Sequence, residues 1–508
     1  MSIWRKKPIE AFHADAKKND LNRVLTRWGL TSLGIGAIIG GGIFTLTGIA
    51  AHDHAGPALA ISFVIAGIGC LFASLCYAEF SSVLPVEGSA YAYSYGTVGE
   101  IFAWIIGWNL ILEYMMGATT VAVAWSGYFE KLLHQFHINL PYWIMNDPVT
   151  AAEKAAKMGI PYSGFAFNLP ALVITWVVTS ILYKGIKEAA KTNNLIVILK
   201  VAVVLFVIFV GVFFINKDNY SPFIPENVVD SKGVGHFGWS GVVTAATIVF
   251  FAYIGFDAVS TQAGEAINPK KDVPFAIVMS LVICTILYIV VSLVLTGMVR
   301  YDQLDMKAPV ASAFEGIGMP WATVLITIAA VAGLTSVMLV MMLGQTRIFL
   351  GMAKDGLLPK NLFGKLHPQY KTPYKSTILV GAIISIVAAL TPIDKVSEMC
   401  SMGTLLAFAM ISLAVLVLRV KQPNLERPFK TPALFIIGPL GALFNFGLMY
   451  FVRPDTWIAF LCWSALGIIV YFLYSRKNSN LNDHAYESSL RGHDAMLNAS
   501  EEDENNKK

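Results

Sequence analysis

The chain has 508 residues, of which 56% are hydrophobic and only 14% are charged, and its mean hydropathy is +0.62. Soluble domains average about 25% charged residues, so this composition excludes a soluble globular protein and indicates a polytopic membrane protein. The formal net charge of +4 is small, and no nucleic-acid partner is predicted. The charged N-terminal segment has no signal-peptide apolar core, so we expect the first span to be retained.

Twelve stretches of the chain are candidates for membrane-spanning helices, each of which needs about 20 mainly apolar residues. They are 29–51, 58–82, 99–129, 168–183, 194–215, 240–264, 274–299, 320–350, 376–391, 398–419, 433–452 and 456–475. The fourth and ninth are the shortest. The pattern predicts an all-α polytopic membrane protein with twelve transmembrane helices.

The distribution of basic residues predicts the orientation of these helices. If the N-terminus is cytoplasmic, the segments on that side carry about three times as many Lys and Arg residues as the opposite side, as the positive-inside rule requires. We therefore predict a multi-pass protein of the plasma membrane with a cytoplasmic segment 1–28 and a cytoplasmic, disordered tail 476–508. The outer connection 129–167 contains residues 147–158, which suit either a short amphipathic surface helix or a mobile loop.

The first span is unusually rich in glycine: Gly34, Gly36, Gly40, Gly41 and Gly42 lie within it. Glycine weakens a helix by about 1 kcal/mol relative to alanine, so three in a row favour a break. Backbone groups in hydrocarbon must be satisfied within the protein, and freed N–H groups would therefore face a cavity. The alternative is close helix packing through small residues.

A second interruption occurs at Gly255 in the sixth span, and Asp257 follows as a plausible cap for a restarted helix. Paired interruptions at matching positions are typical of transporters built from inverted repeats. The two breaks lead residues 29–215 and 240–419, which we interpret as two repeats of five helices each. Residues 433–475 then form two peripheral helices.

Several motifs occur in a fixed order along the chain. Gly34–Phe44 (GIGAIIGGGIF) and Phe250–Asp257 (FFAYIGFD) resemble the helix 1 and helix 6 signatures of the amino acid–polyamine–organocation superfamily. Further matches are Tyr77–Phe80, Pro85–Tyr91, Asn193–Lys200, Glu265–Pro269, Gly344–Arg347 and Ala353–Pro359. Over residues 20–475 the set most resembles the cationic amino acid transporter branch in its twelve-span bacterial form.

The resemblance implies a five-plus-five inverted repeat (the leucine-transporter fold) with helices 1 and 6 broken, and transport by alternating access. It also implies that the substrate α-carboxylate binds at the helix 1 break and the α-amino group at the helix 6 break. Backbone N–H groups at a helix start suit a carboxylate, and freed carbonyls suit an ammonium. The predicted residues at the two breaks are Ile39, Gly40, Gly41, Gly42, Ile43, Phe251, Ala252, Tyr253 and Ile254.

The helix 6 break and position 41 of helix 1 allow more detailed predictions. The carbonyls of Phe251, Ala252 and Ile254 are expected to be free for an ammonium, and the ring of Phe251 or Tyr253 to cover the substrate or simply to pack. Related bacterial members often carry Thr where this chain has Gly41, so a hydroxyl is missing here.

Glu113 lies near the middle of the third span. An ionisable residue there is costly and functional by default. It suits pairing with a cationic substrate side chain, as the resemblance also implies, or a protonated group hydrogen-bonded within the bundle.

Lys200 lies about 9 Å into the fifth span, counted from residue 194 at 1.5 Å per residue. Its ammonium either extends to the inner surface or, as the resemblance suggests, takes the place of a sodium ion between helices 1 and 8. In the second case Lys200 is the proton-coupling residue. Thr335 and Ser336 on helix 8 are its possible partners.

Other charges near the predicted inner surface are Glu79, Glu87, Asp257, Glu265 and Arg347. They are interpreted as inner-gate pairs or as capping and solvated loop charge. The chain has no Walker loop, nucleophile elbow or metal-ligand quartet, so neither an enzyme nor a cofactor or metal is predicted.

The leading hypothesis is therefore proton-coupled import of L-amino acids with a broad or a cationic, arginine- or lysine-like preference. An amino acid exchanger of the same fold is the nearest alternative. A nutrient-sensing receptor is a more distant one.

Overall fold

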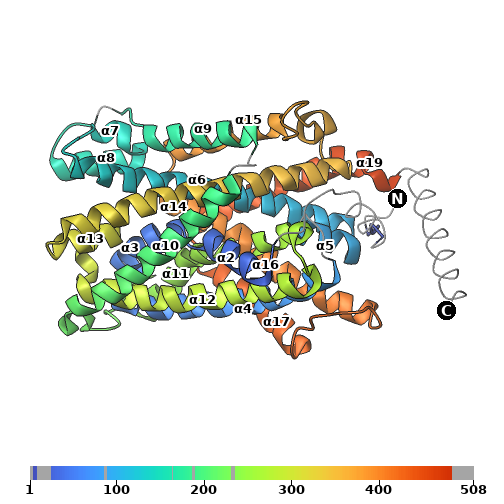
Figure 1. The fold of residues 1–508 in the computed structure, drawn as a ribbon, viewed down its shortest axis with the longest axis horizontal. Coiled ribbons are helices and arrows are strands. Elements are labelled where there is room, and N and C mark those ends of the chain that lie inside the picture. Colours follow the sequence, from blue (N-terminus) through green and yellow to red (C-terminus); the bar gives the residue numbers. More distant parts are fainter. Residues whose placement is uncertain are drawn as a thin grey trace, which may run out of the picture.

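The computed structural model describes residues 4–8, 25–84, 89–162, 164–185, 189–229 and 235–482. Their long helices run roughly side by side in an elongated bundle (Figure 1). The predicted tail beyond residue 482 and the side chains of Glu87 and Glu265 lie outside what is described.

The α-helices take up most of the described chain. They are α2 (Arg27–Ile38), α3 (Thr47–Ala50), α4 (Leu59–Val83), α5 (Ser89–Thr97), α6 (Glu100–Gln135), α7 (Tyr142–Met145), α8 (Pro148–Met158), α9 (Leu169–Lys184), α10 (Ala189–Gly211), α11 (Gly238–Val249), α12 (Pro269–Met298), α13 (Pro309–Gly316), α14 (Pro320–Lys354), α15 (Tyr374–Leu390), α16 (Ile393–Lys421), α17 (Leu434–Tyr450), α18 (Pro454–Val470) and α19 (Arg476–Asn478).

Short 3₁₀ and π-helical segments complete the backbone. They are η1 (Gly42–Leu46), η2 (Ala51–Ala55), η3 (Gly56–Ala58), η4 (Val212–Phe214), η5 (Lys217–Tyr220), η6 (Phe250–Tyr253), η7 (Asp257–Glu265), η8 (Tyr301–Gln303), η9 (Lys360–Gly364), η10 (Tyr471–Ser475) and η11 (Asn480–Asn482). The strands β1 (Val228–Val229) and β2 (Gly235–His236) form one short antiparallel pair.

Helices occupy every stretch that the sequence assigned to a span. In the described chain, eight helices are long and apolar enough to cross a membrane, and α9, α15 and α17 are shorter apolar helices. The first of the eight runs from Gly42 to Val83 and contains a bend at Gly56, where φ is +59°. It therefore combines the second half of predicted helix 1 with predicted helix 2. The multi-pass helical class is confirmed; the number of crossings and the inverted repeat remain predictions.

The centre of the bundle is formed by α6 and α14, which pack along their lengths. On one side α2 and α4 pack against α12, and α16 packs against α6. The pair α9 and α15 forms a separate edge of the bundle (Figure 1). The interior is apolar and aromatic, with Trp104 and Tyr253 among its fully buried side chains. The two interrupted helices lie within this core.

Two segments outside the spans have definite structure. Residues 147–158, which suit a helix or a loop by sequence, form α8, and Asp147 caps it by accepting from the N–H groups of Val149 and Thr150. Residues 476–482, which the sequence assigns to the disordered tail, form α19 and η11. The described start of the tail is therefore ordered, which corrects that part of the prediction.

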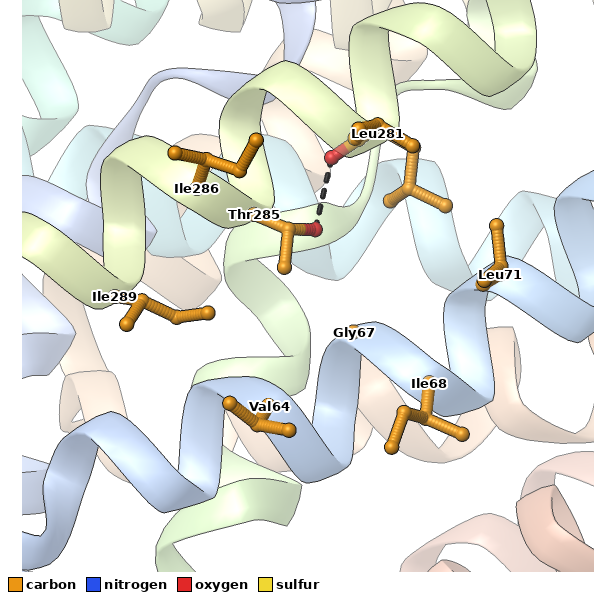
Figure 2. A pocket seen from close by; sticks show the side chains of 9 residues that line it. Val64, Gly67, Ile68, Leu71, Leu281, Thr285, Ile286 and Ile289 are labelled. Carbon is orange, nitrogen blue, oxygen red and sulfur yellow. Dashed lines mark hydrogen bonds between the residues drawn. The ribbon is translucent and has the colours of Figure 1, made fainter.

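An apolar cavity of about 170 Å³ opens between α4 and α12 (Figure 2). Thr285 is among its lining residues, and its hydroxyl donates to the Leu281 carbonyl within the same helix (2.8 Å). Val64, Ile68 and Ile286 line it and are exposed. The cavity therefore faces the apolar surroundings of the bundle and offers nothing that would bind a charged solute.

Candidate substrate-binding site

The backbones of the two interrupted helices cross at the centre of the bundle. Helix α2 ends at Ile38, and Ile39 is extended, with ψ at 100°. A Cβ atom placed on Gly42 would lie 2.2 Å from the Cα of Ala252. No side chain fits there, so Gly42 is required by the close approach of the two backbones.

The second interruption follows η6. Ile254 is extended, with ψ at 133°, and Gly255 has a φ of +121°. A Cβ on Gly255 would lie 2.9 Å from the carbonyl carbon of Ala37. Gly255 is therefore needed both for its conformation and for contact with α2, and each break packs against the other helix.

Lys200 satisfies the carbonyl end of α2. Its ammonium donates to the carbonyls of Gly36 (2.5 Å) and Ile39 (3.0 Å), and the residue is fully buried. A Cβ on Gly333 of α14 would lie 2.5 Å from Lys200 Cδ, so the lysine stem packs on α14. A cation at the C-terminal end of a helix is favoured by the helix dipole. Of the two readings of Lys200, the geometry agrees with a position between helices 1 and 8.

The predicted partners of Lys200 on α14 are placed differently from one another. The Thr335 hydroxyl donates to the Val331 carbonyl (2.8 Å) and accepts from the indole N–H of Trp125 (3.0 Å). One of these hydrogen bonds stays within α14 and the other leads to α6, so neither reaches Lys200, which corrects this interpretation. Ser336 is buried.

The carbonyls at the helix 6 break are less free than the sequence predicts. The Phe251 carbonyl accepts from the Ile254 N–H (3.1 Å). The hydroxyl of Tyr288 lies 3.0 Å from the Ala252 carbonyl and 2.8 Å from that of Ile38. A carbonyl has a second lone pair, so both groups retain the capacity to accept from an ammonium. Tyr288, which no sequence pattern singles out, joins the two breaks.

The two aromatic residues of η6 have different surroundings. Phe251 Cε1 lies 3.7 Å from the Cβ position of Gly41, so this ring borders the helix 1 break. The Tyr253 hydroxyl donates to the Phe63 carbonyl on α4 (2.7 Å). Phe251 therefore borders the helix 1 break, whereas Tyr253 packs in the core.

Gly41 borders the most open part of the helix 1 break. A Cβ placed there would meet Ala124 Cβ at 3.5 Å, Leu334 Cδ2 at 3.7 Å and Phe251 at 3.7 Å. These are ordinary contact distances, in contrast to the overlap at Gly42. Position 41 therefore accepts a small side chain without displacing its neighbours.

Glu113 is buried on α6, three turns before Ala124. Eleven residues of helix correspond to a rise of about 16 Å and return to nearly the same face. Gly117, between them on that face, lies against Met341 and Cys400. The position of Glu113 is therefore well removed from Gly41, to which the substrate carboxylate is assigned.

The surroundings of Glu113 were not predicted. The polar groups that act on its carboxyl are the Asp257 carboxylate and the Thr404 side chain, and neither of its oxygens has a hydrogen bond of good geometry among the described residues. Asp257 in turn accepts from the Tyr114 hydroxyl at 2.9 Å. A charged residue within a span, such as Asp257, could have pointed to this interaction. The sequence analysis instead assigned Asp257 to capping or to an inner gate, and not to an interaction with Glu113.

Glu79, which the sequence assigned either to an inner gate or to capping and solvated loop charge, pairs with basic residues of α16 and of the connection after it. Its carboxylate accepts from the guanidinium of Arg419 and from the Thr431 N–H (2.8 Å), and it forms an ion pair with Arg427 (3.2 Å). These contacts connect α4 to α16 and to the connection after it. They are typical of a structural ion pair.

The opposite end of helix 1 is covered. The Tyr128 hydroxyl donates to the Phe44 carbonyl (2.6 Å), and a Cβ on Gly48 would lie 2.4 Å from the Asp305 carbonyl oxygen. Lys307 donates to Glu130 (2.5 Å) and to Asn146 (2.6 Å). Burial lowers the pKa of the Lys307 ammonium, and Glu130 opposes this shift. This end of the bundle is therefore closed by packed connections.

Two crossed helix interruptions inside a bundle of apolar helices are typical of one class of protein, the polytopic membrane transporters. The family model for amino acid permeases matches residues 25–474. The chain belongs to this family, and it is a transporter and not an enzyme.

Known relatives have several transport assignments. The chain is 44% identical to a methylthioribose transporter and 46% identical to the branched-chain amino acid permease BcaP, both from Bacillus subtilis (strain 168). Each comparison covers 483 residues, 95% of this chain and 99% of the relative. It is 36% identical to the vacuolar cationic amino acid transporter 4 of Arabidopsis thaliana over 430 residues, 83% of this chain and 68% of that protein.

Proposed function

We propose that the protein imports L-amino acids across the plasma membrane by alternating access, driven by protons. The observation that carries the proposal is the crossing of two interrupted helices at Gly42 and Gly255. Such breaks present N–H groups to a carboxylate and carbonyls to an ammonium. In this proposal Gly40, Gly41, Gly42 and Ile43 bind the carboxylate by their backbone, and Ile39 completes the turn.

The amino group of the substrate binds at the second break. The Ile254 carbonyl and the remaining lone pairs of Phe251 and Ala252 supply acceptors, while the Phe251 ring covers the substrate. This mode reads only the two groups that all α-amino acids share. It therefore supports a broad preference, and the names of relatives that act on branched-chain and cationic amino acids are consistent with that breadth.

Proton coupling is assigned to Lys200. Its ammonium donates to the carbonyls of Gly36 and Ile39 at the break itself. Loss of the proton would leave the Lys200 amine with one hydrogen-bond donor fewer for these buried carbonyls. The present conformation of the helix 1 break would then be less stable. The proposal thus links protonation to the shape of the carboxylate site.

The membrane arrangement follows from the same fold. In this proposal the five-plus-five repeat and two further helices give twelve crossings, an even number, so both termini lie on one side of the membrane, and the excess of Lys and Arg assigns that side to the cytoplasm. The two ends of the described chain lie together, since Arg5 donates to Asn482 at 2.5 Å.

Uptake into proteoliposomes tests the function. We expect labelled alanine to accumulate when an inward proton gradient is imposed and not when the gradient is collapsed. Lys200→Met should abolish gradient-driven accumulation. Uptake that is indifferent to the gradient, or full activity of this variant, would contradict the coupling.

An exchanger is distinguished in the same vesicles. Vesicles without internal amino acid should take up alanine if the protein is a proton-coupled importer. Uptake that requires preloaded amino acid would show exchange instead.

A further inference from the structure

We propose that Glu113 carries a proton, which it donates in a hydrogen bond to the Asp257 carboxylate, and that this pair is a second site of proton coupling. The proposal rests on the proposed function, because it concerns the same driving ion and the same transport cycle. It goes further by assigning a proton to two buried carboxyl groups, in addition to the proton on Lys200.

The first step is the burial of two carboxyl groups without a counter-ion. Glu113 and Asp257 are each 1% exposed, and they interact electrostatically. Among the described residues, no Lys, Arg or His forms an ion pair with either of them. An unpaired buried charge is strongly unfavourable, and two neighbouring carboxylates disfavour each other's charge. One of the two carboxyl groups therefore needs a proton.

The second step is the set of hydrogen-bond donors around Glu113. The Thr404 side chain acts on its carboxyl, but the Thr404 hydroxyl donates to the Cys400 carbonyl at 3.0 Å. The Cys400 thiol in turn donates to the backbone carbonyl of Glu113 at 3.1 Å. A hydroxyl has one proton and two lone pairs, so Thr404 is left to accept from Glu113. These surroundings suit a carboxylic acid and not a carboxylate.

Asp257 has the opposite surroundings. Its Oδ2 accepts from the Tyr114 hydroxyl at 2.9 Å. Asp257 is also the first residue of η7, where the backbone N–H groups of a helix start favour a negative charge. Its Oδ1 has no hydrogen-bond partner among the described residues and is left to accept from Glu113. The proton therefore belongs to Glu113, and Asp257 is the carboxylate.

The third step excludes a metal cation in place of the proton. Hard cations such as Ca²⁺ take about six to eight oxygen ligands, whereas the neighbours of Glu113 include the thiols of Cys70 and Cys400. One turn along α6, Gly117 faces sulfur atoms of Cys400 and Met341. The described part of the chain contains no group of three or more His, Cys, Asp or Glu side chains that could hold a metal ion. A proton needs only the two carboxyl groups.

The position of Asp257 links this proton to the transport cycle. Asp257 lies two residues after Gly255, whose φ of +121° marks the interruption of helix 6, whereas Glu113 lies on the central helix α6. A movement of η7 relative to α6 separates the two carboxyl groups and admits water. The O–H bond of Glu113 then breaks and water accepts the proton. Glu113 stays a carboxylate until a proton from the opposite side of the membrane re-forms the bond.

Infrared spectroscopy of the purified protein tests the protonation state without requiring transport. At neutral pH, the difference spectrum between wild type and Glu113→Gln should contain the carbonyl band of a protonated carboxylic acid. Glu153→Gln, at an exposed position on α8, is the matched control and should give carboxylate bands only. Carboxylate bands alone for Glu113→Gln would overturn the proposal, and so would loss of the wild-type acid band when sodium ions are added at constant pH.

Accumulation of alanine in proteoliposomes tests the coupling. Glu113→Gln keeps a hydrogen-bond donor for Asp257 but has no proton to release, so one proton fewer moves with each alanine. Each coupled proton changes the accumulation ratio by about tenfold per pH unit. With a gradient of about one pH unit and the membrane potential clamped, the ratio should fall by about tenfold relative to wild type and Glu153→Gln. An unchanged ratio would overturn coupling at this pair.

Asp257→Asn decides the question if Glu113→Gln does not fold. It replaces a charged acceptor by a neutral one, so the acid band of Glu113 should move to higher frequency, and a band that stays in place would contradict the hydrogen bond. The two proposals fail differently. An acid band without gradient-driven uptake would overturn proton-driven import and leave the proton on Glu113, while gradient-driven uptake without the band would overturn the carboxyl pair alone.

Discussion

At the scale of single residues, the glycines of helix 1 have different physical roles although they are adjacent. Gly42 has no room for a side chain because the backbone of Ala252 lies against it, whereas Gly41 faces ordinary contact distances. In the sequence the two positions look equivalent, because both are glycine and they are adjacent. Their difference arises from where the second interrupted helix crosses the first.

Gly42→Ala should destabilise the protein, because its Cβ would lie 2.2 Å from Ala252 Cα. Overpacking of a core typically costs about 1–3 kcal/mol, and backbone on both sides leaves little room to relax. Thermal unfolding of the purified protein measures this. Gly41→Ala is the matched variant and should keep the wild-type midpoint; equal midpoints for the two variants would contradict the assigned contact.

Glu113 is the second residue whose role depends on the structure. If Glu113 recognised a cationic side chain, Glu113→Gln would weaken the binding of arginine more than the binding of alanine. Because Glu113 lies far from Gly41 and close to Asp257, we expect the Gln substitution to change the affinities for arginine and alanine by the same factor. Affinities for arginine and alanine in the variant provide the measurement, and a selective loss of arginine would restore the cationic interpretation.

At the scale of elements, the two interruptions are joined by side chains from helices that are themselves continuous. Tyr288 of α12 bridges the Ile38 carbonyl at the end of α2 and the Ala252 carbonyl in η6. Lys200 of α10 donates to the carbonyls of Gly36 and Ile39. A broken helix is stable in a membrane when its exposed carbonyls are satisfied in this way.

Tyr288→Phe removes one hydroxyl that serves both breaks. The hydroxyl can donate to one of the two carbonyls at a time, and leaving a buried acceptor without its donor costs about 1–3 kcal/mol, so the thermal midpoint should fall and amino acid affinity should weaken. Tyr370→Phe is the control, because Tyr370 is exposed and its ring is retained. A Tyr288→Phe protein with wild-type midpoint and affinity would show that the bridge is unimportant.

At the scale of the whole molecule, the two ends of the described chain meet on the same carboxylate. Glu100 is fully buried at the start of α6. It accepts from Arg5 (3.3 Å), Tyr471 (3.0 Å) and Ser479 (2.5 Å). Residues before the first span and after the last are thereby attached to the central scaffold helix, which explains why the tail begins as an ordered segment.

Glu100→Gln should loosen both terminal segments. Hydrogen bonds to a charged group contribute about 1.5–3 kcal/mol, and Arg5, only partly buried, would lose its carboxylate partner. We expect a lower thermal midpoint and faster proteolysis of the terminal segments. Glu153→Gln, at an exposed position on α8, should change neither, and unchanged proteolysis of Glu100→Gln would contradict the attachment.

The family, the helical class and the positions of the helices were all predictable from the sequence. Runs of about 20 apolar residues are a local property, and so are the glycines at 40–42 and 255 that weaken a helix. The helix ends differ by several residues, as at α12 and α16, because polar residues beyond the apolar run continue the helix.

By itself the sequence determined that two helices are interrupted, since glycine acts on its own segment of backbone. Only the tertiary structure decided what surrounds the interruptions. It places Lys200 on the carbonyls of α2, Thr335 against Trp125, and Glu113 beside Asp257 and far from Gly41. These contacts depend on the register in which separate helices pack, and residues distant in sequence carry no local signal of that register.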